Sequence, residues 1–136
     1  MNIILSANNN KDVYTLPIVP NGIEINSPQK NETFEGLNRD ITLIGNPGLK
    51  EIPITSFFPV NKDYPFIAQE AEKNGWRYVE FIENLKKSKT PVRVIITNKQ
   101  KYTVFNGLCS IENFKFKTDN VGDIQYTLDL KEFTEL

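Results

Sequence analysis

The amino-acid sequence predicts an α+β fold that is mostly β, either an antiparallel β-sandwich or a partly closed barrel, with one main amphipathic helix. Residues 124–131 alternate between apolar and polar side chains, which is the pattern of a half-buried strand. Residues 75–89 show clear helical periodicity, and turn-forming residues divide the rest into short apolar segments. Because 136 residues are the size of one domain, we expect a single domain over residues 1–136.

The first quarter of the chain predicts a β-hairpin. Residues 2–6 and 13–16 are short apolar segments, joined by a turn-forming stretch over residues 8–12. Pro17 and Pro20 exclude a helix or a central strand through the next stretch. A turn at residues 20–22 is then expected, before apolar and polar residues alternate again over residues 23–26.

Short strands are expected next, at residues 33–34 and 41–44. Gly45, Asn46, Pro47 and Gly48 predict a tight turn whose glycines adopt positive φ. A longer strand over residues 49–58 follows that turn. A short helix is expected over residues 66–73.

The segment 75–89 predicts an amphipathic helix of about three turns. One arc of this helix is apolar and comprises Tyr78, Val79, Phe81, Ile82 and Leu85. The other arc is polar and comprises Arg77, Glu80, Glu83, Asn84 and Lys87. Lys86 and Lys87 suit the negative C-terminal end of the helix, and Pro91 prevents its continuation.

The last third of the chain predicts a return to strands. Residues 92–97 are rich in β-branched side chains, and residues 102–105 and 108–116 flank Asn106 and Gly107. That pair is typical of a tight turn or of a bulge. With the final strand at residues 124–131, we expect about eight strands.

Composition argues against an enzyme and against a bound cofactor or metal. The chain has no histidine, which removes the commonest general base and every His-containing metal site. Its single cysteine, Cys109, lies among apolar residues and is expected to be a small buried side chain. Asp119 and Asp123 loosely resemble a calcium loop but lack its ligand spacing, so a turn between two strands is the favoured interpretation.

Charge is distributed unevenly along the chain. Residues 86–117 contain eight basic residues and one acidic residue, a net charge of +7, whereas the remainder carries −8. One interpretation is a solvated face, and the other is a basic surface that meets an acidic surface of another copy or partner. Nucleic acid is a weaker option because the pI is near 5.5.

Trp76 either caps the core or anchors a partner. The candidate assembly surface therefore comprises Lys86, Lys87, Lys89, Arg93, Lys99, Lys101, Lys115, Lys117 and Trp76.

Targeting signals are not evident in this sequence. Residues 1–6 have neither the basic region nor the long apolar stretch of an export signal, and no run approaches the length of a membrane helix. With one cysteine, synthesis in the cytoplasm is the expectation.

Several segments together resemble the N-terminal domain of phage tail and baseplate proteins related to the PBSX-prophage LysM family. The resemblance covers nearly the whole chain from about Leu16. It is carried by Ser27-Pro28-Gln29-Lys30-Asn31-Glu32-Thr33-Phe34, Gly48-Leu49-Lys50, Ser56-Phe57-Phe58-Pro59, Tyr64-Pro65-Phe66, Tyr78-Val79-Glu80-Phe81-Ile82-Glu83, Pro91-Val92-Arg93-Val94-Ile95-Ile96-Thr97, Ile111-Glu112-Asn113-Phe114 and the segment 122–132.

The resemblance implies a tail-tube-like fold and a structural role in a contractile tail or a phage-tail-like bacteriocin of Gram-positive bacteria. Such proteins join the tail tube to the baseplate hub. The implied partners are copies of the chain in a hexameric ring, the tail tube protein, the baseplate hub protein and the tape measure protein. Members commonly carry a C-terminal LysM domain, which is not expected within these residues, so the chain is either a short member or a fragment.

Two other functions remain as alternatives at this stage. One is a cell-wall-directed module or peptidoglycan-degrading enzyme of the tail tip, which would need a carboxylate pair or a metal site in a cleft. The other is a free-standing ligand-binding module, which would stay monomeric.

Overall fold

A computed structural model describes residues 1–20, 22–60, 64, 67–68 and 71–134 of the chain. These residues form eight strands and one helix, in the order β1 (Asn2–Ala7), β2 (Asp12–Thr15), β3 (Glu32–Glu35), β4 (Asp40–Leu43), β5 (Glu51–Phe58), α1 (Trp76–Ser88), β6 (Val92–Thr97), β7 (Thr103–Thr118) and β8 (Ile124–Glu132). All strand pairings are antiparallel. The predicted α+β, mostly β class with one main helix is confirmed.

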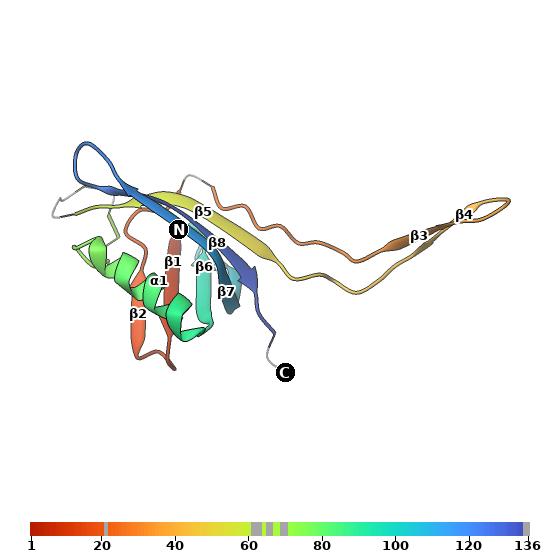
Figure 1. Ribbon diagram of the computed structural model, residues 1–136, viewed down its shortest axis with the longest axis horizontal. Coiled ribbons are helices and arrows are strands. Elements are labelled where there is room, and N and C mark those ends of the chain that lie inside the picture. Colours follow the sequence, from red (N-terminus) through yellow and green to blue (C-terminus); the bar gives the residue numbers. More distant parts are fainter. Residues whose placement is uncertain (21, 61–63, 65–66, 69–70, 135–136) are drawn as a thin grey trace.

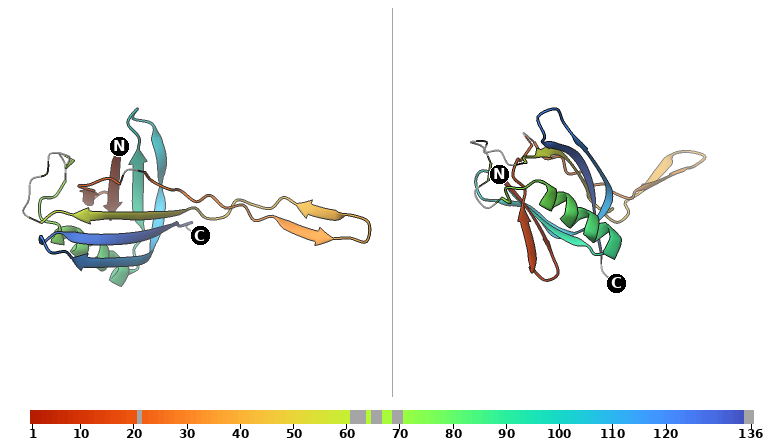
Figure 2. Two further views of the ribbon diagram at one scale, coloured as in Figure 1. Left: turned by 90° about the horizontal axis from the view of Figure 1, so that it is seen from above. Right: turned by 60° about the vertical axis from the view of Figure 1, so that its left-hand side comes forward.

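Six of the strands form one open sheet in the order β2-β1-β6-β7-β8-β5. The sheet is not closed into a barrel, because β2 and β5 lie at its two edges. The long strand β7 turns the sheet: residues 103–109 pair with β6, whereas residues 109–118 pair with β8. As a result, β1 and β6 run across the direction of β5 and β8, and α1 packs on the sheet (Figure 2).

The hydrophobic core lies between α1 and the bent sheet. The predicted apolar arc of the helix is buried, and it comprises Tyr78, Val79, Phe81, Ile82 and Leu85. Phe58 of β5 stacks between Tyr78 and Tyr126, with ring centroids 4.7 Å and 4.0 Å away. Burying these large aromatic side chains supplies much of the favourable free energy of folding. The predicted helix face is therefore confirmed.

Strands β3 and β4 form a separate two-stranded sheet that projects far from the rest of the molecule (Figure 1). We call residues 26–50 the arm and the remaining described residues the body. At the base of the arm, Asn26 and Glu51 exchange two backbone hydrogen bonds of 2.8 Å and 2.9 Å. Every residue from 31 to 44 is exposed. The arm thus contributes nothing to the core.

The tight turn predicted at residues 45–48 is wrong. This stretch is one side of the arm: the Lys30 N–H donates to the Asn46 carbonyl at 2.9 Å, and the Gly48 N–H donates to the Pro28 carbonyl at 2.8 Å. Among the described glycines, only Gly122 has a positive φ. The chain reverses instead at the tip of the arm, over residues 36–39. The glycines are needed because the two sides of the arm approach closely, and a Cβ at Gly45 would collide with the carbonyl oxygen of Lys30.

The division of residues 102–116 into two strands is also wrong. Asn106 and Gly107 pair with β6 without a shift in register, so they form neither a turn nor a bulge. The chain reversal lies earlier, where the Asn98 side chain accepts hydrogen bonds from two backbone N–H groups of residues 100 and 102. The register of β7 shifts instead at Val104, in its pairing with β6, and at Glu112, in its pairing with β8.

Other local predictions have mixed outcomes. The β1–β2 hairpin, the turn at residues 119–123 and the alternating strand β8 are confirmed. Residues 23–26 form only an isolated bridge at Asn26 rather than a strand. The described residues within 66–73 are not helical, and residues 66, 69 and 70 of that predicted helix lie outside the described residues, as does Asn21 of the predicted turn at 20–22. No helix of the described chain is long and apolar enough to cross a membrane.

Candidate assembly interface

The structure places the predicted basic residues in three separate parts of the body. Lys86, Lys87 and Lys89 lie at the C-terminal end of α1, and Arg93 follows in β6. Lys99 and Lys101 lie in the β6–β7 connection, at the opposite end of β6. Lys115 and Lys117 lie near the end of β7. A single contact therefore cannot use all eight residues.

Some of these residues already have partners within the chain. The Lys86 ammonium lies 3.2 Å from a Glu83 carboxylate oxygen, one helical turn away. The Arg93 guanidinium donates to the Asn106 side chain at 3.0 Å. Both interactions are exposed and contribute little to stability.

Trp76 lies beside the third basic group. It is the first residue of α1, and its ring meets the Phe116 ring edge-on, with centroids 6.4 Å apart. Trp76 remains 38% exposed and Phe116 41% exposed. The two rings thus form an apolar surface that the body only partly covers.

Lys115 and Lys117 flank Phe116 in the sequence of β7. Over these residues β7 pairs with β8 and with no other described strand, so this edge of β7 is open. Lys115, Phe116 and Lys117 also line one shallow depression of about 450 Å³ with residues of β5 and β8. Arg77, the neighbour of Trp76, is exposed as well. We call this surface the aromatic–basic edge, comprising Trp76, Arg77, Lys115, Phe116 and Lys117.

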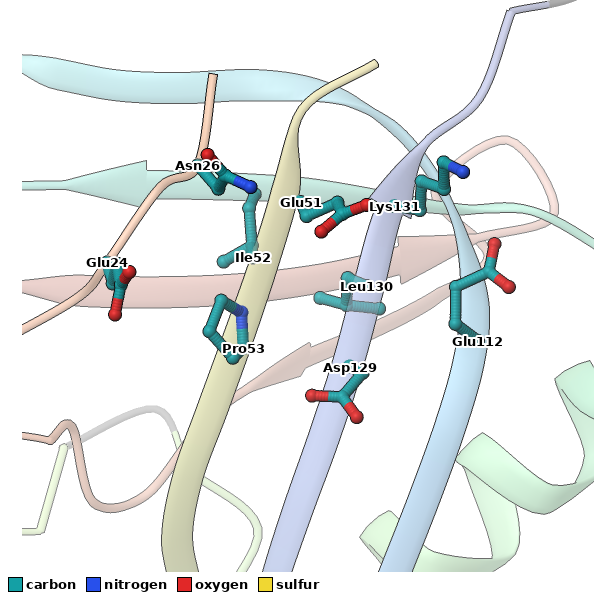
Figure 3. Close-up of a pocket in the computed structure, with 9 residues that line it drawn as sticks. All are labelled: Glu24, Asn26, Glu51, Ile52, Pro53, Glu112, Asp129, Leu130 and Lys131. Carbon is teal, nitrogen blue, oxygen red and sulfur yellow. The ribbon is translucent and has the colours of Figure 1, made fainter. Parts of the chain in front are cut away.

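A second depression, of about 410 Å³, lies at the base of the arm and is acidic (Figure 3). Its ionisable lining residues are four carboxylates and one lysine, namely Glu24, Glu51, Glu112, Asp129 and Lys131. Strand register places Glu51, Asp129 and Lys131 on the same face of the sheet as Lys115 and Lys117. This face therefore has an acidic end beside the arm and a basic end near the β7–β8 loop.

The carboxylates Asp119 and Asp123 have a structural position. Asp119 accepts hydrogen bonds from the backbone N–H groups of Val121 and Asp123, at 3.0 Å and 2.9 Å. The buried Asp123 side chain accepts from the Tyr64 hydroxyl at 2.5 Å and from the Val60 N–H at 3.2 Å. The hydrogen bond to Asp123 raises the pKa of Tyr64. These contacts hold the β7–β8 loop against the chain that follows β5.

Metal ligands do not cluster in the described part of the chain. No cluster of three or more Cys, Asp or Glu residues there is arranged to hold a metal ion. Cys109 is buried as expected, and burial raises the pKa of its thiol to about 12. The thiol is therefore protonated near neutral pH and is a poor nucleophile.

Comparisons with known proteins give a fold and one sequence relative. No family model matches the chain. Over 126 residues it is 36% identical to the uncharacterized protein YqbP of Bacillus subtilis (strain 168), covering 90% of this chain and 55% of YqbP. The chain thus spans about half the length of this relative.

Among solved structures, the chain is similar to one in the virion of a native gene transfer agent particle. The TM-score is 0.60 at 13% identity, and the match covers 98% of this chain and 92% of that chain. At this level of identity the likeness shows a shared fold.

The sequence predicts the two short strands of the arm but not their projection from the body (Figure 1). These strands carry apolar residues at alternating positions, which is also the pattern of strands that cover a core. The one available signal is the concentration of Pro and Gly on both sides of the hairpin, at Pro28, Gly45, Pro47 and Gly48. These residues suit an extended two-stranded segment with little side-chain packing.

Proposed function

We propose that this chain is a structural component of a phage tail or a phage-tail-like particle. The observation that carries the proposal is the fold shared with a gene transfer agent virion chain over 98% of this sequence. The projecting arm supports it, because an exposed element with no role in the core is typical of proteins that assemble with neighbours.

Within such a particle, the chain acts as a ring-forming adaptor or tube initiator that joins the tail tube to the baseplate hub. Its partners are copies of itself, in a ring that the family resemblance implies is hexameric, together with the tail tube, baseplate hub and tape measure proteins. Synthesis and assembly take place in the bacterial cytoplasm. The open edges of β2 and β5 support this role, since unpaired strand edges can pair with neighbouring chains.

The proposal assigns the chain a structural role rather than an enzymatic one. Three observations support that assignment: the sequence has no histidine, its cysteine is buried and protonated, and Asp119 and Asp123 already hold a loop. Cell-wall binding is not part of the proposal.

The test is to delete the gene in a bacterium that forms such particles and to restore it with an epitope-tagged copy. We expect the deletion strain to lose normal tails, and antibody against the tag to label one end of the tail in electron micrographs. An untagged copy of the gene is the control for the antibody. Normal tails that lack the tagged chain would contradict the proposal, and peptidoglycan hydrolysis by the purified chain would favour the enzymatic alternative.

A further inference from the structure

The arm has one apolar face that no described residue of its own chain covers. Register places Phe34 directly opposite Ile41, and Leu43 lies on the same face two residues further along β4. These three side chains are 52%, 49% and 52% exposed. The other face carries Thr33 and Thr42. A hairpin that is apolar on one face only is usual where that face covers a core, and an isolated two-stranded hairpin is marginally stable in water.

The arm reaches too far to fold back on the aromatic–basic edge of its own body. About twelve residues separate its base at Asn26 and Glu51 from its tip, which at the rise of a strand is about 40 Å. The start of α1 and the β7–β8 loop lie at the end of the body opposite the arm (Figure 1). The aromatic–basic edge belongs to that far end, because Trp76 begins α1 and Phe116 lies near the end of β7. A contact between the two therefore requires a second copy.

The two surfaces are complementary in charge as well as in hydropathy. Near its tip the arm carries Glu32, Glu35 and Asp40 against Arg39. Glu35 lies directly opposite Asp40, and two like charges in that position destabilise a strand pair unless a cation lies nearby. The aromatic–basic edge offers three such cations, Arg77, Lys115 and Lys117. Lys115 and Lys117 lie on the face of β7 opposite the Phe116 ring, just as Glu35 and Asp40 lie on the face of the arm opposite Phe34 and Ile41.

We infer that the arm of one copy docks through Phe34, Ile41 and Leu43 on the aromatic–basic edge of a second copy. The contact is heterologous, since each copy contributes a different surface, and such contacts generate a ring or a filament. The inference rests on the proposed function for its biological setting, but the contact itself can be tested on the purified chain.

The test uses two variants that each remove one side of the contact. The arm variant combines Phe34→Ser with Ile41→Ser, and its control combines Thr33→Ser with Thr42→Ser on the opposite face. The edge variant combines Lys115→Glu with Lys117→Glu, and its control combines Lys99→Glu with Lys101→Glu in the β6–β7 connection. None of the substituted positions belongs to the core. The circular dichroism spectrum and the unfolding midpoint of each variant should therefore match those of the unaltered chain.

Molar mass is measured by sedimentation over a range of concentrations. We expect the unaltered chain and both controls to associate, and each variant alone to remain at the mass of one chain, 15.6 kDa. A mixture of the two variants should form complexes of twice that mass and no larger, because the edge variant retains its arm and the arm variant retains its edge. Only a heterologous contact between copies gives this pattern.

Three results would overturn the inference. They are association of the arm variant at the level of the unaltered chain, a mixture that stays at the mass of one chain, and an unaltered chain that never associates, which would assign the arm to a different protein. The two failures are distinguishable. Association as expected with the tagged chain absent from tails contradicts the proposed function alone, whereas a chain that reaches tails without associating contradicts the inference alone.

Discussion

Tyr78 connects separate elements of the body through one side chain. Its hydroxyl donates to the Thr15 carbonyl of β2 at 2.5 Å and accepts from the Glu72 N–H at 2.8 Å, while its ring stacks on Phe58 of β5. Burial raises the pKa of this hydroxyl, so it stays protonated and able to donate. The edge strand β2 is thereby fixed to α1, although it is only four residues long.

Cys109 gives a prediction about pH. Burial raises the pKa of its thiol from 9.0 to about 12. The folded chain therefore holds this proton at pH values where the unfolded chain releases it, so the free energy of unfolding should fall as pH rises from 9 towards 12. Cys109→Ala should make that decline shallower, because the raised tyrosine pKa values remain in both proteins and only the thiol is removed.

Urea unfolding at pH values between about 7 and 11 measures this effect. Curves that decline in parallel for the two proteins would mean that the thiol is not the group responsible. The same burial predicts that Cys109 reacts with a thiol reagent only after unfolding.

At the scale of elements, α1 gives the clearest test of the core. Phe81 is buried and its ring lies 4.3 Å from that of Tyr14 in β2, whereas Glu80 is exposed on the opposite face of the helix. Phe81→Ala should lower the free energy of unfolding by about 3 to 5 kcal/mol because it leaves a cavity. Glu80→Ala is the matched control and should change it by less than about 0.5 kcal/mol. Similar unfolding midpoints for the two variants would mean that Phe81 does not lie on the face of α1 that packs against the sheet.

The arm gives a second prediction at this scale. A side chain at Gly45 would meet the Lys30 carbonyl, so Gly45→Val should separate the two sides of the arm. Because the arm lies outside the core, the melting temperature of the body should not change. Gly22→Val is the control, since a Cβ there meets nothing within 4 Å.

Hydrogen exchange measured over residues 28–47 reports on the arm. Faster exchange there, with exchange in the body unaltered, is the expected result for Gly45→Val. Loss of protection throughout the chain would contradict the division into arm and body.

Local patterns explain which elements were predictable from the sequence. Strict periodicity defines α1 and β8, because each buries one face against the core and the pattern repeats over several turns or residue pairs. The basic residues and the proline at its C-terminal end also define where α1 stops. Asn106 and Gly107 misled the prediction because a turn pair is a local signal, whereas the pairing of β7 with β6 is set by contacts distant in sequence. The glycines of residues 45–48 suggested positive φ, whereas the structure uses them for the close approach of the two sides of the arm.

For the candidate interface, the sequence identified the residue types but not their arrangement. Trp76 and Lys115–Lys117 are forty residues apart, and only the packing of α1 beside β7 brings Phe116 against Trp76. The arm was predictable as two short strands, but its projection from the body depends on where the chain rejoins β5. No local pattern carries that information.

For the whole molecule, the uneven charge along the sequence becomes an uneven charge in space. The sheet face of β5, β8 and β7 is acidic beside the arm and basic near the β7–β8 loop. Complementary charges orient two molecules as they approach, although each exposed pair contributes at most about 1 kcal/mol.

This arrangement predicts how charge reversal affects incorporation into particles. Lys115→Glu with Lys117→Glu should lower the amount of tagged chain in purified tails, whereas Lys99→Glu with Lys101→Glu should have a smaller effect. Raised salt should weaken association of the unaltered chain, because dissolved ions screen the attraction between charges. The range of that attraction is already only about 8 Å at physiological ionic strength. Equal incorporation of both variants at low and high salt would indicate that the basic residues are only a solvated face.

The most direct measurement of the central claim is a cryo-electron microscopy map of the intact tail of a particle that contains the tagged chain. The account predicts copies of the chain arranged head to tail around the tail axis, with Phe34 and Ile41 of each arm in density against Trp76 and Phe116 of the next copy. A tail without the chain, or a ring in which the arms contact no neighbouring copy, would contradict it.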